Sequence, residues 1–438
     1  MSRPRLPLDR RRFLRTGSTA ATLAAARALG PALFAGCSAG LPSPGEPIVL
    51  GLLHSQTGTL AISETSLRDA ELFAIEEINA GGGVLGRRLE AKSPDPRSRP
   101  LDLFPKRARE LCERAGAAAL FGCWTSSSRK AVIPVLEEFG RLLFYPVQSE
   151  GNECSRNVIY GGSIPNQQIL PAVDWLFSTA GGGRQRLFLL GSDYVFPRTA
   201  NLIVKRSLAA AGLEPAGAAY VPLGHRQFAG AVEMILASKA DCVLSTLNGD
   251  SNIAFFAALA EADIDPEDIP VVSTSVGEDE LRNLPPDQVA GHLAAWSYFQ
   301  SLPTEANEGW VKRFRREFGY DRVTSDPMEA AYCLVHLWKL AVEKAGSLET
   351  TAVREALRDS LAFAGPGGEA RIDPATQHAF KRFRLGRILA DRQFEIVHES
   401  AELIPPDPFP QVAFPGWACD WTATGITAGP EVSIDGDL

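Results

Sequence analysis

Short apolar runs alternate along the chain with longer segments in which apolar residues recur every three or four positions. The run 47–55 is almost continuously apolar, as expected for a strand that is buried on both faces. The segment 66–82 has apolar residues at helical spacing and ends in Gly81 and Gly82, which give a helix stop signal. The alternation continues to residue 147 and is repeated from residue 166 to residue 277. Such regularity predicts an α/β fold whose parallel sheets are covered by helices on both faces.

The two successive sets of strand and helix units predict two doubly wound lobes. Helical patterns return at 307–319 and 326–346, and short strands follow, so we expect the chain to re-enter the first lobe and then the second. The expected lobe boundaries are 48–167 plus 293–362 for lobe 1 and 168–292 plus 363–410 for lobe 2, with 411–438 as a C-terminal tail.

The residues before the first strand have the pattern of an export signal rather than of a folded element. They combine a basic region, a mildly apolar run and Cys37. The segment RRRFLR resembles a twin-arginine motif with Arg10 and Arg11 as the pair, and LFAGC resembles a lipobox with Cys37 as the lipidated residue. We therefore expect 1–36 to be a twin-arginine-like lipoprotein signal. The mature chain would be an exported, periplasmic or cell-surface lipoprotein that contacts the membrane through its acyl chains.

A transmembrane anchor is the alternative interpretation of the same segment. Arg27 interrupts the apolar run, which is already shorter than the roughly 20 apolar residues that a span requires. No later segment is long and apolar enough to cross a bilayer. These features favour a lipid anchor over a membrane span.

Charge and cysteine content narrow the classes of function. The whole chain has a formal charge of −8 and the leader contributes +6, so the remainder is near −14. An acidic protein disfavours nucleic acid as a partner, because phosphates need Lys and Arg. Beyond Cys37, no cysteines form a C-x-x-C pair, and no His or Cys cluster has zinc spacing. We therefore expect no metal and no other cofactor, and the spacing reveals no disulfide framework.

The loops that follow the predicted strands are the candidate ligand site, because open α/β sheets bind ligands at the carboxyl ends of their strands. These loops are rich in hydroxyl, amide, acidic and aromatic residues; they are 54–65, 122–129, 145–153, 191–198, 245–252 and 273–280. Arg129 and Arg198 are the exceptions, and each stands late in its loop. The set offers more acceptors than cations.

The loop 122–129, GCWTSSSR, has a run of hydroxyls where a strand gives way to a helix. It does not fit the G-x-S-x-G nucleophile elbow, and the glycine patterns that cradle phosphate do not occur at these turns. Ser126 to Ser128 stand at a helix N-terminus, where backbone N–H groups are free. Simple capping and hydrogen bonding to a ligand oxygen both remain open for these serines.

Long, ordered segments carry a resemblance to a known family. They are GLLHSQTGTLAISETSLRDAELFAIEEINAGGG, LFGCWTSSSRKAVIPVLEEFGRLLFYPVQSEGNE, GSDYVFPRTAN, STLNGDSN and SVGEDEL. Over residues 48–410 the chain resembles the urea-type substrate-binding proteins of ABC transporters and, more distantly, short-chain amide sensors. The resemblance implies a type I periplasmic-binding-protein fold, with two lobes joined by three crossovers. It also implies capture of urea or a close short-chain amide between the lobes, delivery to ABC permease subunits in the membrane, and no catalysis.

Urea needs partners for one carbonyl oxygen and four N–H donors, since a buried unpaired polar group costs about 1–3 kcal/mol. The residues that the resemblance and this chemistry imply for ligand binding are Trp124, Ser126, Tyr145, Gln148, Asp193, Tyr194 and Glu278. Trp124 would stack on the planar ligand, Ser126 would donate, and the others would supply acceptors. Two of them have simpler interpretations, since Asp193 can cap the next segment and Glu278 can be an ordinary acid in a first helical turn.

Two further hypotheses remain open at this stage. One is an amide-sensing receptor that signals to a protein partner without transport, although an export signal argues against a cytoplasmic sensor. The other is an amidase that uses Cys123 with Lys130 and Glu278, although Cys123 stands at the end of an apolar run and is expected to be buried. For the receptor, we expect the lobes to close about crossovers near 164–168 and 292–296.

Overall fold

The computed structural model describes residues 45–419. The expected export signal and the lipidation site Cys37 lie outside the described residues, as does the chain beyond Cys419. Within residues 45–419, none of the helices combines the length and the apolar character that a bilayer span requires.

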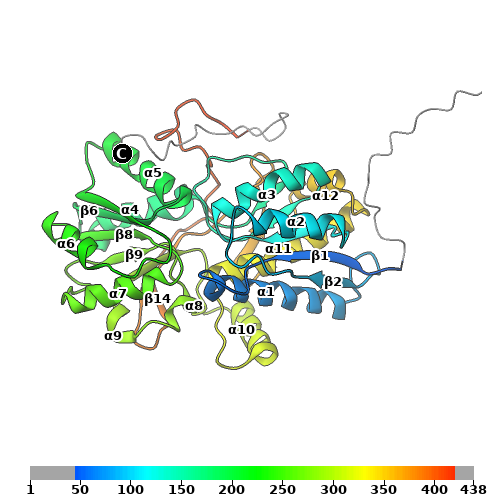
Figure 1. Ribbon diagram of the computed structural model, residues 1–438, viewed down its shortest axis with the longest axis horizontal. Coiled ribbons are helices and arrows are strands. Elements are labelled where there is room, and N and C mark those ends of the chain that lie inside the picture. The colour runs from blue at the N-terminus through cyan, green and yellow to red at the C-terminus, as the bar shows by residue number, and fades with distance from the viewer. Residues whose placement is uncertain (1–44, 420–438) are drawn as a thin grey trace, which may run out of the picture. The chain divides into compact units, whose positions relative to one another are not determined.

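Five parallel strands form the first sheet in the order β2-β1-β3-β4-β5. They are β1 (Ile48–Leu53), β2 (Leu89–Lys92), β3 (Ala119–Gly122), β4 (Leu143–Tyr145) and β5 (Val158–Tyr160). The first three connections contain α1 (Ala61–Ala80), α2 (Leu103–Glu113) and α3 (Ser126–Phe139). Three later helices also pack on this lobe (Figure 1); they are α10 (Glu305–Phe318), α11 (Asp326–Ala345) and α12 (Thr350–Arg358).

The second sheet has seven strands in the order β14-β13-β10-β9-β8-β6-β7. The parallel strands are β6 (Leu187–Ser192), β7 (Gly217–Val221), β8 (Cys242–Thr246), β9 (Val271–Ser273) and β10 (Leu293–Trp296). β13 (Arg384–Ile388) and β14 (Phe394–Glu399) add an antiparallel edge. The helices of this lobe are α4 (Ile169–Phe177), α5 (Val195–Ala210), α6 (Ala229–Ala237), α7 (Ser251–Glu261), α8 (Glu278–Leu281) and α9 (Pro286–Val289). Short 3₁₀ turns cover Pro165–Gln167 and Thr179–Gly181.

Alternation along the strands places apolar side chains on both faces of the second sheet. Leu187 and Leu189 of β6 belong to one hydrophobic cluster, whereas Phe188 and Leu190 belong to another. This is why the strands appear in the sequence as continuous apolar runs: each residue is buried, but successive residues face opposite layers of helices.

The chain passes between the lobes three times, after β5, after β10 and after the hairpin of β11 (Ala362–Gly365) and β12 (Gly368–Arg371). The prediction of an α/β fold with two doubly wound lobes and three crossovers is therefore confirmed. Two expected boundaries differ from the observed pairing. β10 pairs with β9, so the second crossover follows Trp296 rather than preceding Leu293. The hairpin packs on α11, so residues 362–371 belong with the first lobe.

The cysteines divide into one disulfide and four buried thiols. Cys154 and Cys419 are bonded to each other, a pairing that the cysteine spacing does not indicate. Among the described residues, Cys112, Cys123, Cys242 and Cys333 are free and buried. The disulfide attaches the end of the described chain, expected to be a loose tail, to the loop between β4 and β5.

Candidate functional site

The loops at the carboxyl ends of the two sheets meet between the lobes. Trp124, which follows β3, donates its indole N–H to Asn248 Oδ1 after β8 over 3.3 Å. Gln148, which follows β4, donates its amide to the carbonyl of Thr274 at 3.0 Å and to Ser275 Oγ at 2.9 Å, both after β9. The strand-end loops of the two lobes are thus in direct contact.

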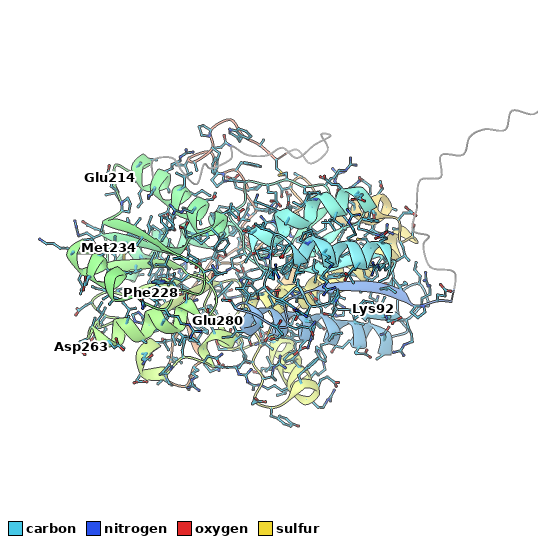
Figure 2. All side chains as sticks on the ribbon, viewed as in Figure 1. Lys92, Glu214, Phe228, Met234, Asp263 and Glu280 are labelled. Carbon is cyan, nitrogen blue, oxygen red and sulfur yellow. A yellow bond between two sulfur atoms is a disulfide. The ribbon has the colours of Figure 1, made fainter. Side chains whose placement is uncertain are left out.

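A narrow pocket lies at this junction and is called the Trp124 pocket below. It is too tight to hold a water molecule, and its walls are Ser63, Leu67, Trp124, Gly277, Asp279, Glu280, Trp296, Ser325 and Pro327. Among the described residues that line it, none is Lys or Arg. Figure 2 shows Glu280 in this position, between α8 of one lobe and α1 of the other.

Hydroxyl and carboxyl groups join the lobes at the Trp124 pocket. Ser63 Oγ of α1 donates to Glu280 Oε1 of α8 at 2.6 Å, and Ser66 Oγ donates to Asp279 Oδ1 at 2.9 Å. Ser325 Oγ donates to the other oxygen of Asp279 at 3.1 Å, and the backbone N–H of Gly277 donates to Glu280 Oε2 at 2.9 Å. Both acids are therefore held by neutral donors.

Burial changes the protonation of these two acids. It raises the pKa of Asp279 to about 6, against the opposing effect of the Ser66 and Ser325 hydrogen bonds. Burial and the neighbouring Asp279 raise the pKa of Glu280 to about 7, again against its hydrogen bonds. Near neutral pH, Glu280 is therefore close to its midpoint, and the pocket changes from protonated to ionised acceptors.

Ser126 begins α3 beside Trp124 but belongs to a polar network of its own. Its hydroxyl donates to Glu150 Oε2 and accepts from Arg129 Nη1 at 3.1 Å. The N-cap of α3 is Thr125, whose side chain accepts from the backbone N–H of Ser128 at 3.0 Å. The hydroxyl run is thus divided between capping and a charged cluster, and Ser126 does not line the Trp124 pocket.

The charged cluster around Arg129 is buried except for Lys130, and the late position of Arg129 in its loop does not indicate this burial. Arg129 is 0% exposed and donates Nε–H to Glu153 Oε1 at 2.8 Å. Lys130 Nζ lies 2.8 Å from Glu153 Oε2, and Tyr160 donates its hydroxyl to Glu153 Oε1 at 2.8 Å. Burial alone would raise the pKa of Glu153, but Arg129 and Lys130 together lower it below its ordinary value. The Arg129 guanidinium is therefore paired with carboxylates of its own lobe.

Tyr145, Gln148 and Tyr194 lie around the same junction. The Tyr145 hydroxyl donates to the backbone carbonyl of Trp124 at 2.6 Å, which fixes the segment that carries the indole. Gln148 Oε1 is buried and has no hydrogen-bond partner among residues 45–419. Burial raises the pKa of the Tyr194 phenol well above its ordinary value, and the neighbouring Tyr145 and Glu150 add to the shift. These three residues border the junction without lining the Trp124 pocket.

The remaining two predicted residues are used elsewhere. Asp193 is exposed and accepts from Arg198 Nε at 2.8 Å. It therefore forms a local ion pair with a residue of α5. Glu278 is buried, but its Oε1 accepts the backbone N–H of Gln300 at 2.6 Å. Its neighbours Asp279 and Glu280 line the pocket instead. The neighbours of Glu278, rather than Glu278 itself, therefore face the Trp124 pocket.

The three residues of the amidase hypothesis do not form a catalytic site in the structure. Cys123 is 0% exposed, and burial, with a smaller contribution from Glu64, raises the pKa of its thiol far above the ordinary value. Because the thiolate is the nucleophile, such a cysteine is unreactive. Lys130 is engaged by Glu153, and Glu278 lies on α8 of the other lobe.

A buried pair of side chains, His54 and Glu71, lies under the N-terminal half of α1. His54 Nε2 lies 2.8 Å from Glu71 Oε1. Glu64 Oε2 accepts the backbone N–H of Ser55 at 2.5 Å, and burial raises the pKa of Glu64 to about 7. These contacts fix β1 to α1, so His54 has a structural role, as a lone histidine at a strand end usually does.

Comparisons with known proteins agree with this geometry. The model of the periplasmic binding protein domain family matches residues 48–414. A solute-binding protein of an ABC transporter from Rhodopseudomonas palustris BisB5, in complex with 3,4-dihydroxybenzoic acid, has a TM-score of 0.73 at 19% identity, over 82% of this chain and 99% of that one. An amino acid ABC transporter substrate-binding protein from Pseudomonas fluorescens Pf-5 has a TM-score of 0.72 at 21% identity, over 83% and 98%.

Two further proteins resemble this chain, one in structure and one over a short stretch of sequence. A branched-chain amino acid transporter substrate-binding protein from Streptococcus pneumoniae, in complex with isoleucine, has a TM-score of 0.69 at 17% identity, over 82% of this chain and 100% of that one. A limonene hydroxylase from Geobacillus stearothermophilus is 30% identical over 119 residues, and the match spans 27% of this chain and only 22% of that protein. Because the family model covers most of the chain, the protein belongs to the periplasmic binding protein domain family, which is extracytoplasmic, and has the fold of the solute-binding proteins of ABC transporters.

Proposed function

We propose that the protein captures urea, or a close short-chain amide, in the Trp124 pocket and delivers it to an ABC permease. The observation that carries the proposal is the composition of the pocket wall. It combines two indoles, two serine hydroxyls and two carboxyl groups, and the described lining has no Lys or Arg. Such a wall suits a small, flat and uncharged molecule that donates more hydrogen bonds than it accepts.

Each polar group of urea has a complementary group in this wall. The carboxylates of Asp279 and Glu280 accept from the amide N–H groups, and the hydroxyls of Ser63 and Ser325 are placed to donate to the carbonyl oxygen. The face of Trp124 covers the planar ligand and excludes water. In the free pocket the hydroxyls donate to the carboxyls, so ligand binding exchanges one satisfied set of hydrogen bonds for another.

An amino acid fits the same wall poorly. Its carboxylate would lie beside Asp279 and Glu280 without a cation, because the nearby guanidinium of Arg129 is already paired with Glu153 and Glu150. As the structure stands, the pocket has no room for even a water molecule, so any ligand must enter while the lobes are apart.

Ligand entry requires the lobes to separate. The pocket is narrow throughout, and the hydrogen bonds of Ser63 and Ser66 to α8 close it. Rotation about the three crossovers would break these contacts and expose both walls. Closure around urea would replace the Ser63 contact by bonds to the ligand and would restore the Ser66 contact, and the permease would recognise the closed form. With the expected lipid anchor at Cys37, the receptor would lie beside a membrane permease.

Calorimetric titration of the purified full chain with urea, formamide, acetamide, thiourea and leucine tests the proposal. We expect urea or a short amide to bind and leucine not to bind. Trp124→Ala should weaken binding by at least about tenfold, or 1.4 kcal/mol. Tyr320→Ala, at a tyrosine that is 83% exposed, is the matched aromatic control and should bind like the wild type. Tight leucine binding that Trp124→Ala leaves intact would exclude this pocket and this ligand class.

A further inference from the structure

The last described part of the chain, residues 405–419, lies against both lobes and is called the C-terminal strap below. Asn166, at the first crossover, donates to the carbonyl of Pro405 at 2.9 Å and accepts the N–H of Asp407 at 3.1 Å. Phe409, Ala413 and Phe414 form a small buried cluster with Ile203 of α5. The strap therefore rests on the second lobe, beside α5 (Figure 1).

The strap also grips a loop of the first lobe, residues 148–154, which is called the site loop below. Pro408 accepts the backbone N–H of Asn152 at 2.8 Å, and Cys419 is bonded to Cys154. A Cβ on Gly151 would lie 2.7 Å from the Pro408 carbonyl oxygen, so the two backbones are in close contact. The site loop is thus fixed by a hydrogen bond, a tight backbone contact and a covalent bond.

The site loop needs such support because it is buried and irregular. Gly151 and Asn152 have φ values of 70° and 55°, left-handed conformations that Gly and Asn adopt more readily than other residues. The loop is short of regular structure and nearly all buried, yet it carries Gln148, Glu150 and Glu153. A buried polar loop of this kind keeps one conformation only when the surrounding structure determines it.

The residues of the site loop reach both the ligand wall and the other lobe. Glu150 accepts from Ser126 at the start of α3, two residues after Trp124. Gln148 donates across the junction to Thr274 and Ser275. A shift of the loop would therefore move the segment that carries Trp124 and would remove an inter-lobe contact.

We propose that the C-terminal strap and its Cys154–Cys419 disulfide are a positioning device, which holds the site loop in the conformation that the closed, ligand-binding form requires. Cys154 and Cys419 do not touch the ligand; they act through Gln148 and Glu150. The inference rests on the proposed function for its ligand readout, but not for its structural readout. It makes ligand affinity dependent on an oxidised disulfide.

The experiment compares the full chain, Cys419→Ser, Cys154→Ser and the wild type after reduction of its disulfide. Hydrogen exchange is measured by mass spectrometry on peptides that cover 148–154 and, as an internal reference, on peptides that cover β1. We expect faster exchange in the site loop and unchanged exchange in β1. Calorimetry should show urea affinity lowered by about tenfold in the same samples, since the ligand must then order the loop.

Two controls keep the result specific. Reductant added to Cys419→Ser should change neither exchange nor affinity, because no disulfide remains to be reduced. Phe414→Ala loosens the strap while leaving the disulfide intact, since Phe414 packs with Cys154 and under the guanidinium of Arg206. Phe414→Ala should accelerate exchange in the site loop as well. It replaces the serine variants as the test of the strap if those variants fail to fold.

The outcomes separate this inference from the proposed function. Unchanged exchange in the site loop after reduction would overturn the inference, and so would loss of protection across β1 to the same extent, because the strap would then support the whole lobe. If the wild type does not bind urea but the loop alone loses protection, the positioning role stands and the ligand assignment fails.

Discussion

Replacing Glu280 with Gln should remove part of the pH dependence of the free energy of unfolding. Glu280 is buried between the lobes and accepts from Ser63 Oγ at 2.6 Å and from the N–H of Gly277 at 2.9 Å. Gln has the same shape and an oxygen that can accept either hydrogen bond, but it cannot ionise. The variant therefore separates the charge of the side chain from its packing.

The magnitude follows from the pKa of the buried acid. Burial raises the pKa of Glu280 from 4.5 to about 7. Between these values the folded protein binds more protons than the unfolded chain, so stability falls as pH rises through this window. A shift of about 2.5 units corresponds to about 3 kcal/mol once Glu280 is fully ionised. Asp279, with a pKa of about 6, and Glu64, with a pKa of about 7, add to the dependence with the same sign.

The assay is chemical denaturation of the wild type and Glu280→Gln at about pH 4.5 and about pH 8, on either side of the titration. At the lower pH the two proteins should have similar stability, because both carry a neutral side chain. At the higher pH the variant should be more stable, by up to about 3 kcal/mol. Glu308→Gln, at a side chain that is 61% exposed, should leave the pH dependence unchanged. An equal effect of Glu280→Gln at both pH values would show that Glu280 does not titrate in this window.

Three further predictions follow from buried contacts. Arg129→Met should destabilise the protein by about 3–5 kcal/mol in denaturant titrations, because it leaves Glu153 and Glu150 buried beside a single lysine; a cost below about 1 kcal/mol would contradict the buried pairing. Gly162→Ala should cost more than about 3 kcal/mol, since its Cβ would lie 2.0 Å from the backbone of Val147; wild-type stability would refute that contact. Cys123 should resist alkylation in the native protein at about pH 8, because burial keeps it a thiol; rapid modification in folded protein, followed by peptide mass spectrometry, would reopen the amidase hypothesis.

The parts of the fold that the sequence predicts are those in which burial leaves a regular trace. Strands covered on both faces give apolar runs, and amphipathic helices between them give a period of three to four, so both sheets are largely predictable. β5 is harder to identify, because its three residues, Val158–Tyr160, are too few to show a period. The sheet of β10 is not predictable either, since partner choice depends on contacts such as Leu293 with Val272 that no local pattern specifies.

Some residues of the candidate site are likewise predictable from the sequence, and others are not. Trp124 is predictable, because a large aromatic at the end of a buried strand has few local roles, and it lines the inter-lobe pocket. Glu278 shows the limit. In a helix of only four residues, successive side chains point about 100° apart, and no period reveals which acid faces the pocket. The burial of Arg129 depends on Glu150 and Glu153, more than twenty residues away, and the strap depends on a disulfide between residues 265 positions apart.

The kinds of contact within and between the lobes also differ in a way that suits a receptor. The buried ion pairs of Arg129 join residues of one lobe, where they hold the site loop in place. Apart from the C-terminal strap, several buried contacts between the lobes have neutral donors on amide, carbonyl, hydroxyl or carboxyl acceptors; examples are Trp124 with Asn248, Gln148 with Thr274 and Ser275, and Ser63, Ser66 and Ser325 with α8. Arg282 and Asp321 form an ion pair between the lobes, but their side chains are 37% and 80% exposed.

This division has an energetic consequence. A neutral hydrogen bond contributes about 0.5–1.5 kcal/mol net, and an exposed ion pair about 0–1 kcal/mol, so these contacts between the lobes, the strap excepted, together contribute only a few kcal/mol. A ligand shifts the balance toward the closed form only by its differential affinity for that form, and a ligand that contacts both walls has such a preference. The lobes can therefore open without breaking a buried ion pair and close when a ligand satisfies both walls. A buried charge pair across the same junction would instead hold the empty receptor closed.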